Sequence, residues 1–128
     1  MHSPRPRRIA IADDSPAFVE AAAGYIAALP GYALAGTAAG GEALALIESA
    51  APDVLLLDLG ATPVRGLALV RQARSLPGAP AVIAMTLFQT AEAAAVAVEA
   101  GAAALIGKDR FVSALTQVLA RLFPSEAA

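Results

Sequence analysis

The chain has no cysteine and a single histidine, and these two shortages exclude several kinds of chemistry. Without cysteine it forms no disulfide bond and no thiolate metal site. The histidine, His2, stands ahead of the first apolar segment, so none is left for a Ser-His-Asp triad or a zinc cluster. Any metal site in the rest of the chain must therefore be built from oxygen ligands, which favour a hard cation.

A strong excess of one charge sign is also missing. The formal net charge is −2 over 128 residues, whereas a dedicated nucleic-acid surface would be strongly basic. We therefore expect no nucleic-acid contact by this domain itself. The apolar fraction of 58 % excludes intrinsic disorder, and much of it is alanine, which predicts close helix contacts.

Long apolar runs are absent too. Residues 21–41 carry no charge, but Pro30 and several glycines interrupt them, which argues against a membrane span. The basic start "MHSPRPRR" leads into only four apolar residues, too few for a signal peptide. We expect a disordered leader at residues 1–7, a domain at 8–123, a tail at 124–128, and a cytoplasmic location without membrane contact.

Short apolar segments alternate with segments of helical spacing along the chain. The predicted strands are residues 8–12, 32–37, 54–58, 81–86 and 103–108. Between them apolar residues recur three or four apart, as at Phe18, Ala22 and Ile26 in the first predicted helix. This pattern predicts an α/β fold, a flavodoxin-like (βα)5 three-layer sandwich with a parallel sheet in the order 2-1-3-4-5.

Polar side chains stand where four of the five predicted strands end. They are Asp13 with Asp14, Asp58, Thr86 and Lys108, the one lysine of the chain. Each alone has a structural explanation, such as a helix cap worth about 1 kcal/mol. The carboxyl ends of parallel strands meet at one edge of the sheet, however, and capping does not explain three carboxylates converging there. We therefore expect these side chains to form one site.

Three carboxylates in one cleft need a compensating positive charge. Magnesium fits best, because it binds through one or two carboxylates and completes its shell with water and phosphate oxygens. A cation, a lysine and a hydroxyl around one aspartate are typical of phosphoryl transfer, in which the carboxylate attacks phosphorus. The strand ends thus predict a phosphoacceptor aspartate.

These segments resemble the receiver domain of two-component response regulators. "IADDSP" resembles the acidic pair of that family, "PDVLLLDLG" the phosphoacceptor strand ending in Asp58, "VIAMT" the switch strand ending in Thr86, and "EAGAAALIGKD" the last strand with Lys108. Gly66 follows Asp58 by eight residues, where the family usually has glycine. Other segments, such as "ALPGYALAGTAAGGEALALI", resemble the branch that often carries a helix-turn-helix output domain, which in a longer parent chain would bind DNA.

The resemblance implies a ligand set and partners. Asp14, Asp58 and the backbone carbonyl of Gly60 would hold Mg²⁺, and Asp13 would act mainly through a bound water. A sensor histidine kinase or phosphotransfer protein would donate the phosphoryl group to Asp58. The module would assist its own phosphorylation and dephosphorylation without turning over an independent substrate.

The same resemblance implies a switch. Thr86 and Lys108 would bind the phosphoryl oxygens of Asp58. Movement of Thr86 toward the phosphate would then shift the face formed by the fourth helix, the fifth strand and the fifth helix.

Three positions depart from the family pattern and motivate a second hypothesis. Thr62 stands where proline is usual, Leu87 where a small residue follows the switch threonine, and Leu105 where an aromatic residue is usual. Phe88 follows Leu87 and adds bulk beside the predicted site. The alternative is an atypical receiver that acts, without phosphorylation, as a binding or dimerisation platform. A homodimer through the alanine-rich last helix and its neighbours is compatible with both hypotheses.

An enzyme is the third class of function. The haloacid-dehalogenase-like phosphatases also use an aspartyl nucleophile, in the motif D-x-D-x-T. "DLGAT" at residues 58–62 has the first aspartate and the threonine but not the second aspartate. We therefore rank a phosphatase last.

Overall fold

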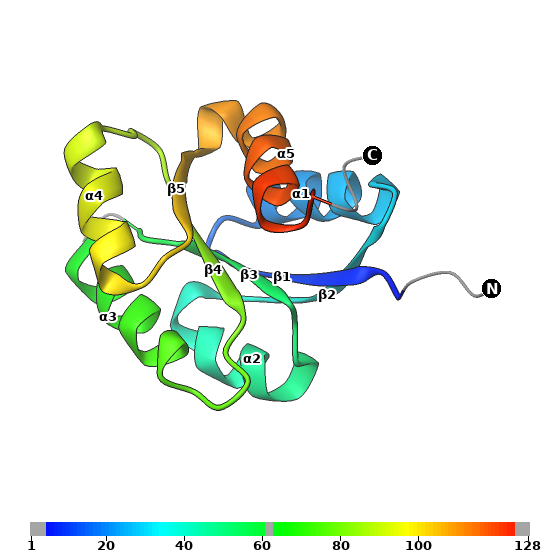
Figure 1. The fold of residues 1–128 in the computed structure, drawn as a ribbon, viewed down its shortest axis with the longest axis horizontal. Helices are drawn as coiled ribbons and strands as arrows, with labels where there is room; N and C mark the ends of the chain where they lie inside the picture. The colour runs from blue at the N-terminus through cyan, green and yellow to red at the C-terminus, as the bar shows by residue number, and fades with distance from the viewer. Residues whose placement is uncertain (1–4, 61–62, 125–128) are drawn as a thin grey trace.

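Five parallel strands form the centre of the fold, in the order β2-β1-β3-β4-β5 (Figure 1). The computed structural model describes residues 5–60 and 63–124. The strands are β1 (Arg7–Ala12), β2 (Tyr32–Ala38), β3 (Val54–Asp58), β4 (Ala81–Thr86) and β5 (Ala104–Gly107). The predicted flavodoxin-like topology is therefore confirmed.

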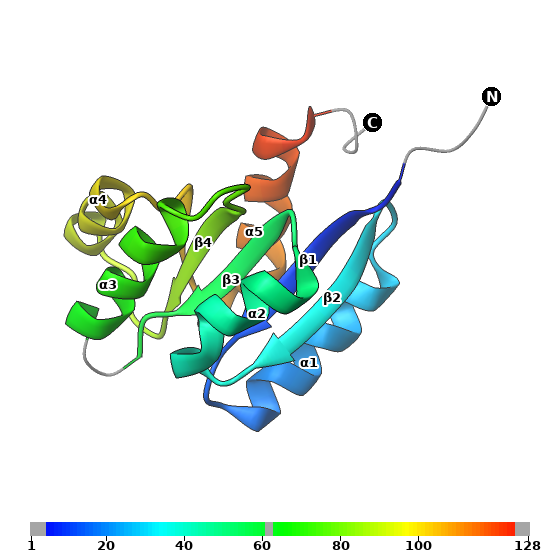
Figure 2. The ribbon, with the colours of Figure 1, turned by 90° about the horizontal axis from the view of Figure 1, so that it is seen from below.

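Helices cover both faces of the sheet in the described part of the chain (Figures 1 and 2). One face carries α1 (Pro16–Ala28) and α5 (Phe111–Leu122), and the other carries α2 (Ala43–Ala50), α3 (Pro63–Arg74) and α4 (Ala91–Ala100). Two short 3₁₀ segments, η1 (Gly40–Glu42) and η2 (Lys108–Arg110), precede α2 and α5. None of these helices has the length and apolarity needed to cross a membrane.

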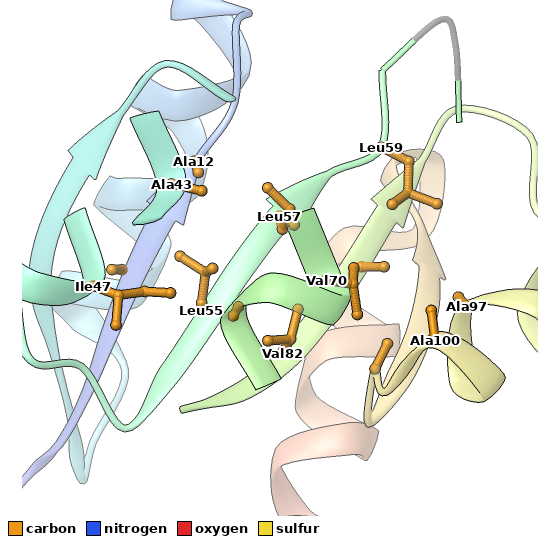
Figure 3. Packing of buried hydrophobic residues seen from close by; sticks show 14 of the residues in the cluster. Ala12, Ala43, Ile47, Leu55, Leu57, Leu59, Val70, Val82, Ala97 and Ala100 are labelled. Carbon is orange, nitrogen blue, oxygen red and sulfur yellow. The ribbon is translucent and has the colours of Figure 1, made fainter. Parts of the chain in front are cut away.

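The central strand β3 shows why this sequence needs cover on both faces. Its first four residues are apolar and fully buried. Because successive strand residues point to opposite faces, Leu55 and Leu57 pack in the α2–α4 layer, whereas Val54 and Leu56 pack in the α1–α5 layer. Figure 3 shows the first of these layers, in which small side chains such as Ala43 are buried among larger apolar ones.

Four strand boundaries differ by one residue from the sequence prediction, among them the end of β2 at Ala38 and the start of β5 at Ala104. Strand β1 begins at Arg7, whose backbone N–H donates to the Gly31 carbonyl at 3.0 Å, so Arg7 lies in the sheet rather than in the expected leader. Strand β5 ends at Gly107, and Lys108 begins η2. The shift at Arg7 follows from a hydrogen bond between neighbouring segments, which apolar patterning does not encode.

Candidate functional site

Lys108 brings two of the predicted carboxylates together at the carboxyl edge of the sheet. Its Nζ lies 2.7 Å from Oδ2 of Asp13 and 3.4 Å from Oδ1 of Asp58. The side chain of Lys108 is 11 % exposed, that of Asp13 is fully buried, and that of Asp58 is 16 % exposed. The predicted convergence of β1, β3 and β5 on one site is therefore present in the structure.

Asp13 depends on this lysine for compensation. Its Oδ1 accepts a hydrogen bond from the backbone N–H of Ser15 at 2.8 Å. Its Oδ2 is buried and accepts no hydrogen bond from the described residues, although the Lys108 ammonium lies within ion-pair distance. A buried carboxylate is costly unless it is paired, so the ion pair with Lys108 is a condition for placing Asp13 here.

Asp14 is not the N-cap of the following helix. Ser15 is the N-cap of α1, and its Oγ accepts from the N–H of Phe18 at 3.3 Å, with Pro16 at the start of the helix. Asp14 Oδ1 instead accepts from the backbone N–H of Gly40 at 2.8 Å. The capping explanation thus applies to Ser15 and leaves the acidic pair available for chemistry.

Two glycines allow the backbone after Asp58 to adopt its conformation and to pack closely against α3. Gly60 has a φ of 77°, in the left-handed region, and its N–H donates to Asp58 Oδ1 at 3.2 Å. A Cβ on Gly66 would lie only 2.6 Å from the Cα of Leu59, so α3 packs directly on the backbone of this loop. This contact is the physical reason for glycine eight residues after Asp58. Thr62, one of the departures noted above, lies outside the described residues.

A hollow of about 160 Å³ opens between Asp14 and Asp58. Gly40, Gly60 and Arg65 contribute to its lining. The sequence analysis missed Arg65, which directly precedes Gly66 and is placed at the rim by the packing of α3 on Leu59. Arg65 thus adds a cationic residue to the lining of a hollow that contains Asp14 and Asp58.

The donor set fits a hard cation, although the described residues hold no ready-made group of three or more His, Cys, Asp or Glu side chains arranged around a metal. The buried Asp13 Oδ2 faces the Lys108 ammonium and adds negative charge to the site, and the other two carboxylates, Asp14 and Asp58, border one hollow. All are oxygen donors, the ligands that Mg²⁺ prefers. In this structure the Lys108 ammonium supplies the positive charge between Asp13 and Asp58.

Thr86 is the last residue of β4, the strand next to β3. In the β3–β4 register Asp58 pairs with Met85, so Thr86 stands one residue beyond the position opposite Asp58. Thr86 also borders a groove of about 400 Å³ between α3 and α4, which we call the α3–α4 groove. Its lining residues are Leu59, Pro63, Leu67, Thr86, Phe88, Thr90, Glu92, Ala93 and Val96.

The departures beside Thr86 take different positions. Leu87 and Phe88 are 65 % and 84 % exposed, whereas Leu105 is buried beneath α4. The Nε2 of Gln89 donates to the Leu105 carbonyl at 2.8 Å and ties the β4–α4 loop to β5. Leu105 thus packs as an apolar core residue, and the loop is secured by an amide that the sequence analysis did not single out.

The comparisons with known proteins agree with this geometry. The family described as response regulator receiver domain matches residues 9–120. A protein-glutamate methylesterase/protein-glutamine glutaminase from Anaeromyxobacter dehalogenans is 35 % identical over 112 residues, which are 84 % of this chain and 30 % of that protein. The chain therefore spans about a third of this curated relative.

Solved structures share the whole fold. A LuxR-family two-component response regulator from Aurantimonas sp. is 30 % identical, with a TM-score of 0.75 and 95 % of each chain covered. The signal receiver domain of the putative response regulator NarL from Mycobacterium tuberculosis is 26 % identical, with a TM-score of 0.78, 96 % of this chain and 98 % of that chain covered.

Proposed function

The chain belongs to the response regulator receiver domain family, and from this premise we propose that Asp58 accepts a phosphoryl group. The donor in this proposal is a phosphohistidine on a sensor histidine kinase or phosphotransfer protein. The observation that carries it is the Lys108 ammonium between Asp13 and Asp58. The single lysine of the chain, placed within ion-pair distance of Asp58, is suited to hold an anionic phosphoryl oxygen.

The proposed step is a direct displacement. A carboxylate oxygen of Asp58 forms a bond to phosphorus while the phosphorus–nitrogen bond of the phosphohistidine breaks, and the electron pair leaves with the imidazole. Lys108 and the Thr86 hydroxyl bind oxygens of the transferred group. Asp14, Asp58 and the Gly60 carbonyl, with Asp13 through water, would hold Mg²⁺, which when bound supplies further positive charge to those oxygens.

The consequence of phosphorylation in this proposal is a switched protein-interaction face. Thr86 ends β4 and borders the α3–α4 groove, so its movement toward a phosphoryl group on Asp58 would shift the start of α4, and with it the face formed by α4, β5 and α5. We place this signalling in the cytoplasm with the kinase. Binding of DNA, in this proposal, belongs to an output domain rather than to the receiver itself.

One observation favours the alternative, an unphosphorylated platform. Phe88 lines the α3–α4 groove and is 84 % exposed, and Val64 and Leu87, each next in sequence to a lining residue, also expose most of their apolar side chains. Exposed apolar groups gathered in this way are typical of interaction sites. A binding or dimerisation platform would use this surface whether or not Asp58 carries a phosphoryl group.

Incubation with Mg²⁺ and acetyl phosphate separates the two functions. We expect a phosphoryl adduct that is labile to hydroxylamine and is lost in Asp58→Asn. Asp53→Asn is the matched control, because Asp53 accepts from the Arg8 N–H at the opposite edge of the sheet, and asparagine keeps an acceptor there. Absence of an adduct in the wild type, with no response to beryllofluoride, would favour the platform. Repeated turnover of a stable phosphate monoester would instead indicate a phosphatase.

A further inference from the structure

An aromatic ring covers the ammonium group of Lys108. The Nζ atom lies 4.7 Å from the centroid of the Phe18 ring, within the range of a cation–π contact. Phe18 lies in the first turn of α1, and its backbone N–H donates to the N-cap Ser15. The turn that follows the acidic pair therefore also places a ring against the lysine.

We propose that Phe18 is a positioning residue for Lys108 in the proposed phosphoryl-transfer site. A lysine ammonium has three N–H donors. Here Asp13 Oδ2, Asp58 Oδ1 and the Phe18 ring all lie close to this group. The ring occupies space from which water would otherwise solvate the ammonium, and it limits the directions in which the flexible side chain can turn.

Further rings hold Phe18 in this orientation. Phe111 meets Phe18 edge to face, with ring centroids 5.3 Å apart and planes at 84°. Tyr25 meets Phe111 in the same manner at 6.1 Å, and its hydroxyl lies 2.9 Å from the Thr116 hydroxyl. Edge-to-face packing restrains rotation of a ring, so the face of Phe18 stays turned toward the ammonium.

One segment of the chain carries both the lysine and a ring that packs against Phe18. Lys108 begins η2, and Phe111 begins α5 directly after it. The segment that carries the lysine therefore also carries the ring that supports Phe18. When Asp58 receives a phosphoryl group, the ammonium exchanges a carboxylate oxygen for a phosphoryl oxygen while Asp13 and the Phe18 ring continue to hold it.

The single lysine allows a direct test that needs no phosphorylation. Isotope-labelled lysine gives one set of side-chain NMR signals, and the Phe18 ring current should displace the Lys108 Hε resonances from their free-lysine positions. We expect Phe18→Leu and Phe18→Met to abolish most of this displacement and Phe18→Tyr to retain it. Phe88→Leu is the control, because Phe88 is exposed on the α3–α4 side. Unchanged lysine signals in folded Phe18→Leu would overturn the proposal.

Labelling by acetyl phosphate tests the role in transfer. We expect Phe18→Leu and Phe18→Met to slow formation of the adduct by about three- to tenfold, and Phe18→Tyr to restore the rate. If the lysine signals of these variants return toward the free-lysine positions while the rate of adduct formation is unchanged, the positioning role in transfer is refuted. If the wild type forms no adduct, the proposed function fails, and the lysine signals alone decide whether the ring positions the ammonium.

Discussion

The two sides of the sheet differ at its carboxyl edge. On the α1–α5 side, Lys108 is enclosed by Asp13, Asp58 and the Phe18 ring. On the α3–α4 side, Thr86 stands beside an open groove, with Leu87 and Phe88 directed largely to solvent. The first side pairs its charged groups before any ligand arrives, whereas the second exposes apolar surface.

This difference indicates that one side of the domain is built to hold charged groups in place and the other side to change its contacts. A buried charge needs a fixed partner, so the α1–α5 side favours a single arrangement. Exposed apolar side chains make few buried contacts, so the α3–α4 side can change its conformation at a small cost in free energy. The proposed phosphoryl group would lie between these two sides and contact a residue from each, Lys108 and Thr86.

The largest effect should come from removing the lysine. Lys108→Met leaves the buried Asp13 carboxylate without its cation, and we expect the free energy of unfolding to fall by about 2–3 kcal/mol. Urea denaturation measures this. The double variant Asp13→Asn/Lys108→Met should recover part of the loss, and Arg110→Met, an exposed neighbour, should change stability little. A loss no larger than that of Arg110→Met would show that the α1–α5 side is not held by this ion pair.

Gly66→Ala should lower the free energy of unfolding by a smaller amount. The added Cβ would lie 2.6 Å from the Leu59 Cα, so α3 must shift, at a cost of about 1–3 kcal/mol. Gly24→Ala is the matched control, because nothing lies within 4 Å of its Cβ and alanine should stabilise this exposed position in α1 by about 0.5–1 kcal/mol. Opposite signs for the two variants in thermal denaturation would confirm that the base of the open side is tightly packed.

Arg65→Gln should act on ligand affinity rather than on stability. Removing this guanidinium from the rim of the hollow should strengthen Mg²⁺ binding by about two- to threefold at low ionic strength, because like charges repel. Isothermal titration with Mg²⁺ checks this. Arg71→Gln, an exposed change farther along α3, should leave the affinity unaltered. Equal affinities for all three proteins would remove Arg65 from the site.

The smallest effect on stability is expected at Phe88. Because this ring is 84 % exposed, Phe88→Ser should change the free energy of unfolding by less than about 0.5 kcal/mol. Leu115→Ser, in the buried core of α5, should destabilise severely in the same assay. A large loss in Phe88→Ser would contradict the description of the α3–α4 side as open.

The sequence by itself determined the alternation of strands and helices, and with it the edge at which the polar residues meet. The apolar run at 54–57, set between segments of helical spacing, indicates a strand covered on both faces, and the carboxyl ends of parallel strands then bring Asp13, Asp58 and Lys108 close. The strand assignment comes from the local apolar pattern, and the shared edge comes from a rule of sheet topology.

Tertiary structure alone decided which side chains complete the site. The Phe18 ring reaches Lys108 because α1 packs against α5, and Arg65 reaches the rim because Gly66 lets α3 approach Leu59. Similarly, hydrogen bonds to Ser15 and Gly40 separated the roles of Asp13 and Asp14. Periodicity identifies the buried face of a helix, but the atoms that this face meets depend on the distance and angle at which two elements pack.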